Sequence, residues 1–214
     1  MRTKISAKLT SKKIYVVRHG QTDFNLQNIV QGSGIDSDLN ARGREQARAF
    51  YEAYKHVPFD KVYTSALRRT QQSVQSFIDD GLPVESLPGL NEISWGTKEG
   101  FRITPDEDAY YHHMIRQWQL GDTSLRIEAG ESPDDVVKRM QPAIDHIMSQ
   151  SNEGTVLVCM HGRAIRILLC TLLRYPLRCM DTFDHENLCL YQLHFNGSFF
   201  SVELYNDTRH LRLS

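Results

Sequence analysis

Two short polar runs follow apolar segments of this 214-residue chain, and each holds a histidine, a glycine and an arginine. The first run, Arg18-His19-Gly20, ends the apolar segment 14–17. The second, His161-Gly162-Arg163, ends the apolar segment 156–160 and is followed by a helix pattern. Open α/β sheets bind ligands at the carboxyl ends of their strands. Both runs are therefore expected to contribute to one site.

Two more predicted strand ends add charged groups to this site. The run 65–70 supplies Arg69, and the run 90–92 supplies Glu92. Histidines, arginines and a carboxylate together suit phosphoryl transfer through a histidine. One imidazole is the nucleophile, arginines bind the phosphoryl oxygens, and a carboxylic acid protonates the leaving oxygen.

Nothing in the sequence demands a metal or another cofactor. The adjacent pair His112-His113 could be imagined as metal ligands, but neighbours on a helix face different directions. We expect both residues on a helix that covers the site. Segment 96–130 lacks strand signal and is predicted to form this helical lid.

The predicted elements alternate between strand and helix, which indicates a three-layer α/β/α sandwich with a mostly parallel sheet. Asn196-Gly197 between two strand-like runs is a hairpin signal, so at least one strand is antiparallel. The expected strands span 14–17, 59–63, 84–87, 156–160, 188–195 and 199–205. The expected helices span 42–55 and 66–78 or begin at 105, 133 and 163.

Composition sets the class of protein. The length favours one domain, which we place at 14–214, after a basic and flexible tail at 1–13. The formal net charge of −1 argues against a nucleic-acid partner, and no apolar run approaches the ~20 residues of a membrane helix. Four cysteines without C-x-x-C spacing favour a reduced, cytoplasmic protein. The oligomeric state stays open, a homodimer included.

The ordered set of motifs resembles the histidine phosphatase (phosphoglycerate mutase-like) superfamily over nearly the whole chain. A single Arg-His-Gly would be weak support, whereas the ordered set is specific. The matching segments are 18–22 with Asn25, 31–32, 39–43, 63–70, 90–92 with Gly96 and 99–100, 130–132, 161–162 and 206–211.

This resemblance implies a role for each core residue. His19 resembles the phosphorylated nucleophile, and Arg18 and Arg69 resemble the phosphate clamp. His161 resembles the second histidine of the phosphate pocket, and Glu92 the proton donor.

Neighbouring positions are expected to bind the substrate. Asn25 and the Gly162 amide resemble phosphate contacts, and helix N-termini favour anions. For Arg163 two interpretations stay open, a substrate contact or a solvated residue at the helix start. The remaining expected substrate-binding residues are Thr22, Gln31 and Gly32.

The chain departs from the family pattern in its substrate-recognition loop. Ile29 stands where relatives often have arginine, Asp38 stands where they often have proline, and the loop 32–36 is slightly expanded. These changes leave the leaving group of the substrate undetermined.

We therefore predict a metal-independent phosphohydrolase that acts on a small phosphorylated metabolite through a phosphohistidine. One alternative is a phosphoglycerate mutase, and another is a non-catalytic phospholigand-binding protein on the same fold. The predicted lid favours hydrolysis, because Arg102, Arg116 and Arg126 are spaced apart among acidic residues.

Overall fold

The computed structural model describes residues 11–212, apart from the side chain at position 107, and contains a six-stranded sheet of order β3-β2-β4-β1-β5-β6. Strands β1 to β4 are parallel, whereas β5 runs antiparallel to both β1 and β6. The prediction of a mostly parallel α/β sheet with an antiparallel hairpin is confirmed. The strands are β1 (Lys12–Arg18), β2 (Lys61–Thr64), β3 (Val84–Ser86), β4 (Thr155–Met160), β5 (Leu190–Phe195) and β6 (Phe200–Asp207).

Strand register brings the two His-Gly motifs together. Strands β1 and β4 are direct neighbours, and Arg18 pairs with Met160 at the end of their ladder. His19 and His161 each follow one member of this pair. Because β5 is antiparallel, its amino end lies at the same edge of the sheet, so the residues that precede Leu190 also reach the site.

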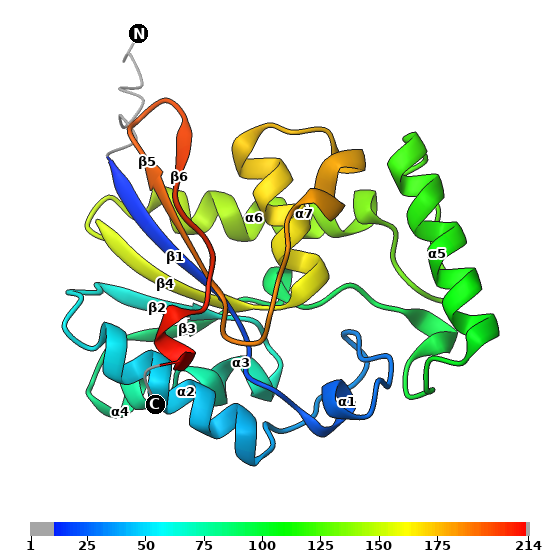
Figure 1. Cartoon of the computed structure of the whole chain (residues 1–214). Coiled ribbons are helices and arrows are strands. Elements are labelled where there is room, and N and C mark those ends of the chain that lie inside the picture. Colours follow the sequence, from blue (N-terminus) through cyan, green and yellow to red (C-terminus); the bar gives the residue numbers. More distant parts are fainter. Residues whose placement is uncertain (1–10, 213–214) are drawn as a thin grey trace, which may run out of the picture.

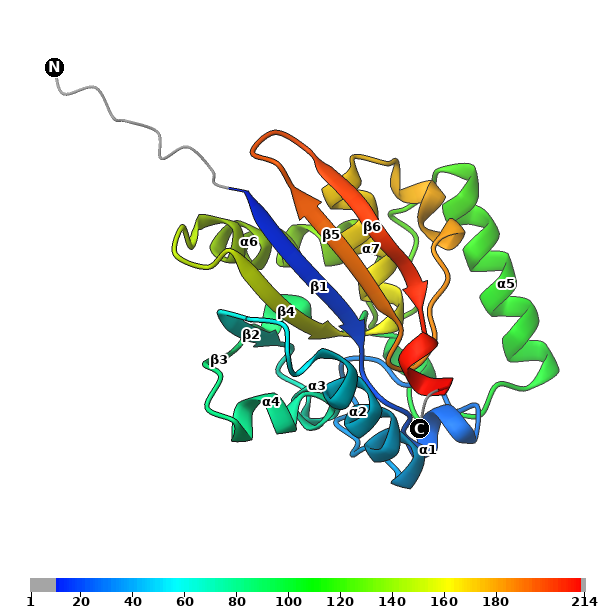
Figure 2. The same ribbon diagram turned by 60° about the vertical axis from the view of Figure 1, so that its left-hand side comes forward.

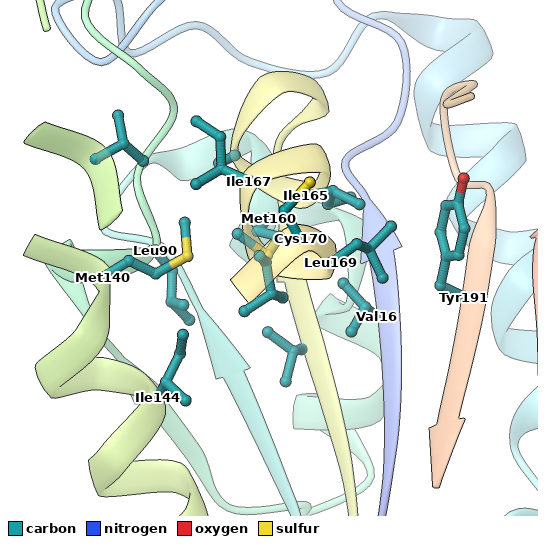
Figure 3. Close-up of a cluster of buried hydrophobic side chains, with 14 of the residues drawn as sticks. Val16, Leu90, Met140, Ile144, Met160, Ile165, Ile167, Leu169, Cys170 and Tyr191 are labelled. Carbon is teal, nitrogen blue, oxygen red and sulfur yellow. The ribbon is translucent and has the colours of Figure 1, made fainter. Parts of the chain in front are cut away.

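Helices cover both faces of the sheet (Figures 1 and 2). Buried residues form one cluster on each face, as a three-layer sandwich requires. Figure 3 shows the larger cluster, in which Met140, Ile165 and Val16 come from two helices and β1. One face carries α2 (Ala41–Tyr54), α3 (Arg68–Ser73) and α4 (Gln75–Asp79), and the other carries α6 (Pro133–Ser149) and α7 (Gly162–Leu173).

Several predicted element ends are shifted by one or two residues, and two predictions were wrong in a larger way. The single helix expected at 66–78 is divided into α3 and α4 at Val74, whose φ of −121° is outside the helical range. The tail predicted at 1–13 overlaps the first strand, because β1 begins at Lys12. The ammonium group of Lys12 is buried and donates to the carbonyls of Ile147 and Gln150 at the end of α6. The rest of that segment, 1–10, lies outside the described residues.

Segment 96–130 is helical at its centre, as predicted. Helix α5 (Pro105–Leu120) packs against η3 (Leu177–Thr182) and inserts Met114 and Trp118 into the larger core cluster. His112 and His113 lie on this helix and are exposed. The remaining short elements are α1 (Asp23–Leu26), η1 (Pro88–Leu90), η2 (Gly96–Lys98) and η4 (Arg209–Arg212).

Within residues 11–212, no helix combines the length and the apolar character that crossing a membrane requires.

Candidate active site

His19 is a buried imidazole whose tautomer is fixed by its own backbone. Nδ1 lies 2.7 Å from the carbonyl oxygen of Gly20. A carbonyl only accepts, so Nδ1 carries the proton and Nε2 keeps its lone pair. Burial, followed by the charges of Arg69 and Arg18, holds the pKa of His19 well below the usual histidine value. The ring is therefore neutral at physiological pH, with a nucleophilic Nε2.

His161 lies beside His19, with ring centroids 5.2 Å apart, and orients Arg69. The Nε–H of Arg69 donates to Nδ1 of His161 over 3.2 Å. The proton of a neutral His161 is therefore on Nε2, which is 2.8 Å from the hydroxyl oxygen of Ser65. Burial, with the charge of Arg69 next, also lowers the pKa of His161 well below its ordinary value. Both ring nitrogens of His161 thus have protein partners.

Arg69 is fully buried and is held by neutral acceptors. Besides His161, its Nη1 donates to the carbonyl of Ile35 over 2.6 Å and its Nη2 to that of Gly32 over 3.1 Å. Burial lowers the pKa of Arg69 to about 10, although nearby Glu92 opposes this. The guanidinium keeps its charge at neutral pH and lies in a water-poor setting.

Arg18 has few partners for its guanidinium. Nη1 lies 3.2 Å from Nδ1 of His185, and Nε is buried without a hydrogen-bond partner. Among residues 11–212, neither Arg18 nor Arg69 has a carboxylate in an ion pair. A positive charge that is removed from water and has no negatively charged partner is costly. This arrangement of two arginines next to His19 suits an anion.

His185 lies in the site but was not predicted from the sequence. Because Nδ1 accepts from Arg18, the neutral ring carries its proton on Nε2. The ring also packs against Gly162, where a Cβ would lie 2.7 Å from Cε1 of His185. Burial and neighbouring arginines lower the pKa of His185 to about 2. The signal that could have identified it is its place before an antiparallel strand, whose amino end meets the carboxyl ends of parallel strands.

Asn187, in the same loop, was missed for the same reason. Its amide donates to the carbonyl of His19 over 3.0 Å and to the side-chain oxygen of Asn25 over 3.3 Å. Asn25 in turn forms a capping box with Thr22 at the start of α1. Asn187 and Asn25 therefore fix the loop that follows His19.

Glu92 is buried at the N-terminus of α7. One carboxylate oxygen accepts from the amide of Arg163 over 3.1 Å, and the other accepts from those of Ala164 and Ile93 over 2.9 and 3.0 Å. Amides at a helix start are oriented to bind such a group. Glu92 is thus tied to the helix that begins directly after His161, a link that sequence reasoning did not predict.

The Arg163 side chain is buried, so it is not the solvated residue that one of the two interpretations expected. It is 4% exposed, and its guanidinium donates to Asp181 over 2.6 Å and to the hydroxyl of Tyr111 over 2.7 Å. It also lies 5.3 Å from the ring centroid of Trp118. The expectation of a solvated residue is therefore wrong: Arg163 joins α7 to helix α5 and η3 through Tyr111 and Asp181. A contact between Arg163 and the substrate stays a prediction.

The recognition loop positions Arg69 through its backbone. Gly32 packs against Glu99, since a Cβ on Gly32 would lie 2.2 Å from a carboxylate oxygen of that residue. Glu99 accepts from the Trp95 amide over 2.9 Å. Glu99 therefore supports the structure of the loop that holds Arg69.

At the far end of this loop, the residues that differ from the family pattern form ion pairs. Asp38 and its neighbour Asp36 pair with the exposed Arg68 at 3.0 and 3.2 Å. Gln31 accepts from the hydroxyls of Thr22, at 3.3 Å, and Ser37. The loop is thus fixed at both ends.

Comparisons with known proteins agree with this fold. The model of the histidine phosphatase superfamily (branch 1) matches residues 14–208, and the chain belongs to this superfamily. It is 31% identical over 208 residues to a probable phosphoglycerate mutase, GpmB, of Yersinia enterocolitica, and the match covers 93% of this chain and 94% of the relative.

Two solved structures are similar over most of their length. The alpha-ribazole phosphatase of Shigella flexneri is 27% identical with a TM-score of 0.79, and the match covers 91% of this chain and 96% of that one. A mycobacterial glucosyl-3-phosphoglycerate phosphatase in complex with VO3 is 26% identical with a TM-score of 0.80, covering 92% and 100%. The similar proteins thus include phosphatases and a probable mutase.

The lowered pKa values of the site histidines predict a stability that falls in mild acid. The unfolded chain binds protons near pH 6.5, whereas buried His19 and His161 stay neutral in the folded protein. The unfolded state therefore binds more protons below pH 6.5, and folding weakens as pH falls. Each such ring should cost about 1.4 kcal/mol per pH unit between pH 6 and pH 5.

Urea unfolding at pH 7, 6 and 5 in phosphate-free buffer measures this slope. The carboxyl groups with lowered pKa values titrate below this window. His161→Gln should make the slope shallower, and His56→Gln at an exposed position is the matched control. A free energy of unfolding that is equal at pH 7 and pH 5 would contradict the prediction.

Proposed function

We propose that the protein is a metal-independent phosphohydrolase that cleaves a small phosphorylated metabolite through a phosphohistidine on His19. One observation carries the proposal: within residues 11–212, a neutral imidazole whose Nε2 lone pair has no hydrogen-bond partner lies beside two arginines that form no ion pair with a carboxylate. The arginines supply the positive charge that a phosphoryl group needs, so the proposed chemistry includes no metal.

The reaction has two steps. In the first, Nε2 of His19 attacks phosphorus, the bond from phosphorus to the ester oxygen breaks, and protonated Glu92 gives its proton to the leaving alcohol. In the second, water attacks the phosphohistidine, Glu92 takes the proton of that water, and inorganic phosphate leaves neutral His19. Arg18 and Arg69 bind the phosphoryl oxygens in both steps.

The hydrogen bond of Nδ1 of His19 supports an attack from Nε2 as the first step. Its proton is held by the carbonyl of Gly20, so the ring attacks from Nε2 without first losing a proton. After attack the ring is cationic, and the same carbonyl stabilises that charge. In this proposal His161 keeps Arg69 in place, and His185 offers an N–H next to Arg18.

A mutase is the second candidate, because a relative that is 31% identical is named a probable phosphoglycerate mutase. A mutase must hold a second anionic group and keep water from its phosphohistidine. The lid arginines do not suit this task. Arg102, Arg116 and Arg126 are all exposed, and Arg126 pairs with Asp135 at 2.9 Å. Hydrolysis is therefore the function we favour.

A covalent intermediate tests the proposal directly. Rapid quenching during turnover should leave an acid-labile, alkali-stable phosphate on His19, and His19→Ala should abolish both label and turnover. His56→Ala is the control, and the reaction should proceed in the presence of a chelator. Label on another residue, or activity restored only by a divalent ion, would contradict the proposal. Binding of phosphate esters without any turnover would instead favour the non-catalytic alternative.

Replacement of Glu92 tests the proton donor. Loss of a general acid costs about 10²–10⁴-fold, so Glu92→Gln should lose activity in that range on alkyl phosphates and much less on phenyl phosphates. Phenolate leaves without protonation, which is the reason for the difference. The change also removes an acceptor for the α7 amides, so the unfolding midpoint is measured in parallel. An equal loss on both ester types would show that the residue has only a structural role.

The products of 3-phosphoglycerate separate phosphatase from mutase. We expect inorganic phosphate or no reaction, with negligible 2-phosphoglycerate, because the lid offers no pair of arginines for the carboxylate. Product analysis by NMR, with phosphate release measured in the same samples, gives the ratio. Rapid isomerisation with little phosphate release would establish the mutase.

A further inference from the structure

A cavity of about 180 Å³ lies between helix α5 and the recognition loop. Three aromatic residues line it, Trp95, Tyr110 and Tyr111, together with aliphatic side chains such as Ile127. Tyr110 is 44% exposed and Ile127 is 5% exposed, so the cavity has an open rim and a buried floor. None of these side chains takes part in the proposed phosphoryl chemistry.

The walls of this cavity are connected to the phosphate site on two sides. On one side, the lining residue Gln31 precedes Gly32, whose carbonyl holds Arg69. On the other side, the hydroxyl of Tyr111 accepts from Arg163, whose amide binds Glu92. The cavity is therefore linked through Gly32 to Arg69, which would hold the phosphoryl group, and through Arg163 to Glu92, which would protonate the leaving oxygen.

The aromatic walls are held in place before any ligand binds. The rings of Trp95 and Tyr111 have centroids 5.6 Å apart, and Trp95 is stacked on buried Trp118 at 6.1 Å. The hydrogen bond from Arg163 fixes Tyr111. Rigid flat walls bind a flat apolar group with little loss of conformational entropy.

The charge of the cavity argues against a second anion. Among its lining residues Lys98 is the cation, and its ammonium group lies 5.3 Å from the ring centroid of Tyr110. A carboxylate or second phosphate would have to leave water for mainly apolar walls, which is costly without several charged partners. An uncharged apolar group has no such cost.

We infer that this cavity binds the leaving group of the substrate and selects a phosphomonoester whose alcohol carries one aromatic ring. The inference rests on the proposed phosphohydrolase. The size of the cavity limits the group, because a dry cavity of about 150 Å³ in another protein accommodates benzene. The present volume of about 180 Å³ therefore admits a single ring with a short linker.

Two esters of primary alcohols test the inference, 2-phenylethyl phosphate and ethyl phosphate. Their leaving oxygens are of similar basicity, so a difference in kcat/KM reports the ring and not the ease of bond breaking. We expect kcat/KM to be at least about tenfold higher for the phenylethyl ester, since even one methylene in an apolar pocket is worth about tenfold or more. We also expect it to exceed that for 3-phosphoglycerate.

Substitutions at the rim of the cavity test whether the preference for the phenylethyl ester arises there. Tyr110→Ala and Ile103→Asp should each lower the ratio of the two kcat/KM values by about tenfold, because both residues line the cavity. Both side chains are exposed, at 44% and 50%, so the variants should fold. Tyr175→Ala, at an exposed aromatic residue that does not line the cavity, is the matched control and should leave the ratio unchanged.

The outcomes separate this inference from the function on which it rests. Equal kcat/KM for the two esters, a preference for 3-phosphoglycerate, or a ratio insensitive to both rim variants would overturn the aromatic leaving group while hydrolysis stands. Absence of hydrolysis of every ester, with no phosphohistidine on His19, would overturn both.

Discussion

The parallel pairing of β1 with β4 is the constraint on which the candidate site depends. It aligns Arg18 with Met160, so the residues that follow each strand, His19 and His161, meet at one edge of the sheet. The two strands are separated by more than a hundred residues in the chain, and their contact is maintained by side chains buried on both faces. A one-residue slip would turn every side chain of β1 to the opposite face and would bury the wrong set.

Around this pairing the protein concentrates positive charge among neutral rings. Arg69 is bound by carbonyls and by His161, and Arg18 by His185. Cationic histidines would repel both arginines. Burial prevents this, because it lowers the pKa values of His19, His161 and His185 and keeps their rings neutral. The carboxyl group of Glu92 accepts hydrogen bonds from the first amides of α7. The site thus retains a net attraction for an anion although the chain as a whole is close to neutral.

Much of this arrangement could be predicted from the sequence, and the failures have physical causes. Apolar runs that end in Arg-His-Gly and His-Gly identify strand ends, because alternation of strand and helix makes their carboxyl ends meet. His185 and Asn187 were missed because they precede a strand, and only the antiparallel direction of β5 brings them to the site. Arg163 was misplaced because its partners Tyr111 and Asp181 come from distant segments. Long-range contacts of this kind have no local signal.

The attachment of Arg69 to Gly32 and Ile35 has a consequence for how such proteins diverge. The segment that carries these carbonyls also contributes Gln31 to the wall of the aromatic cavity. An insertion or exchange in this segment, whether by evolution or by loop grafting, would change the shape of the cavity and displace the guanidinium together. New specificity and weakened catalysis would then arise in the same step. Exposed positions of α5 that line the same cavity, such as Tyr110, lie outside that segment and are the more permissive place for new specificities to arise, whereas Tyr111 of the same helix is tied to Arg163.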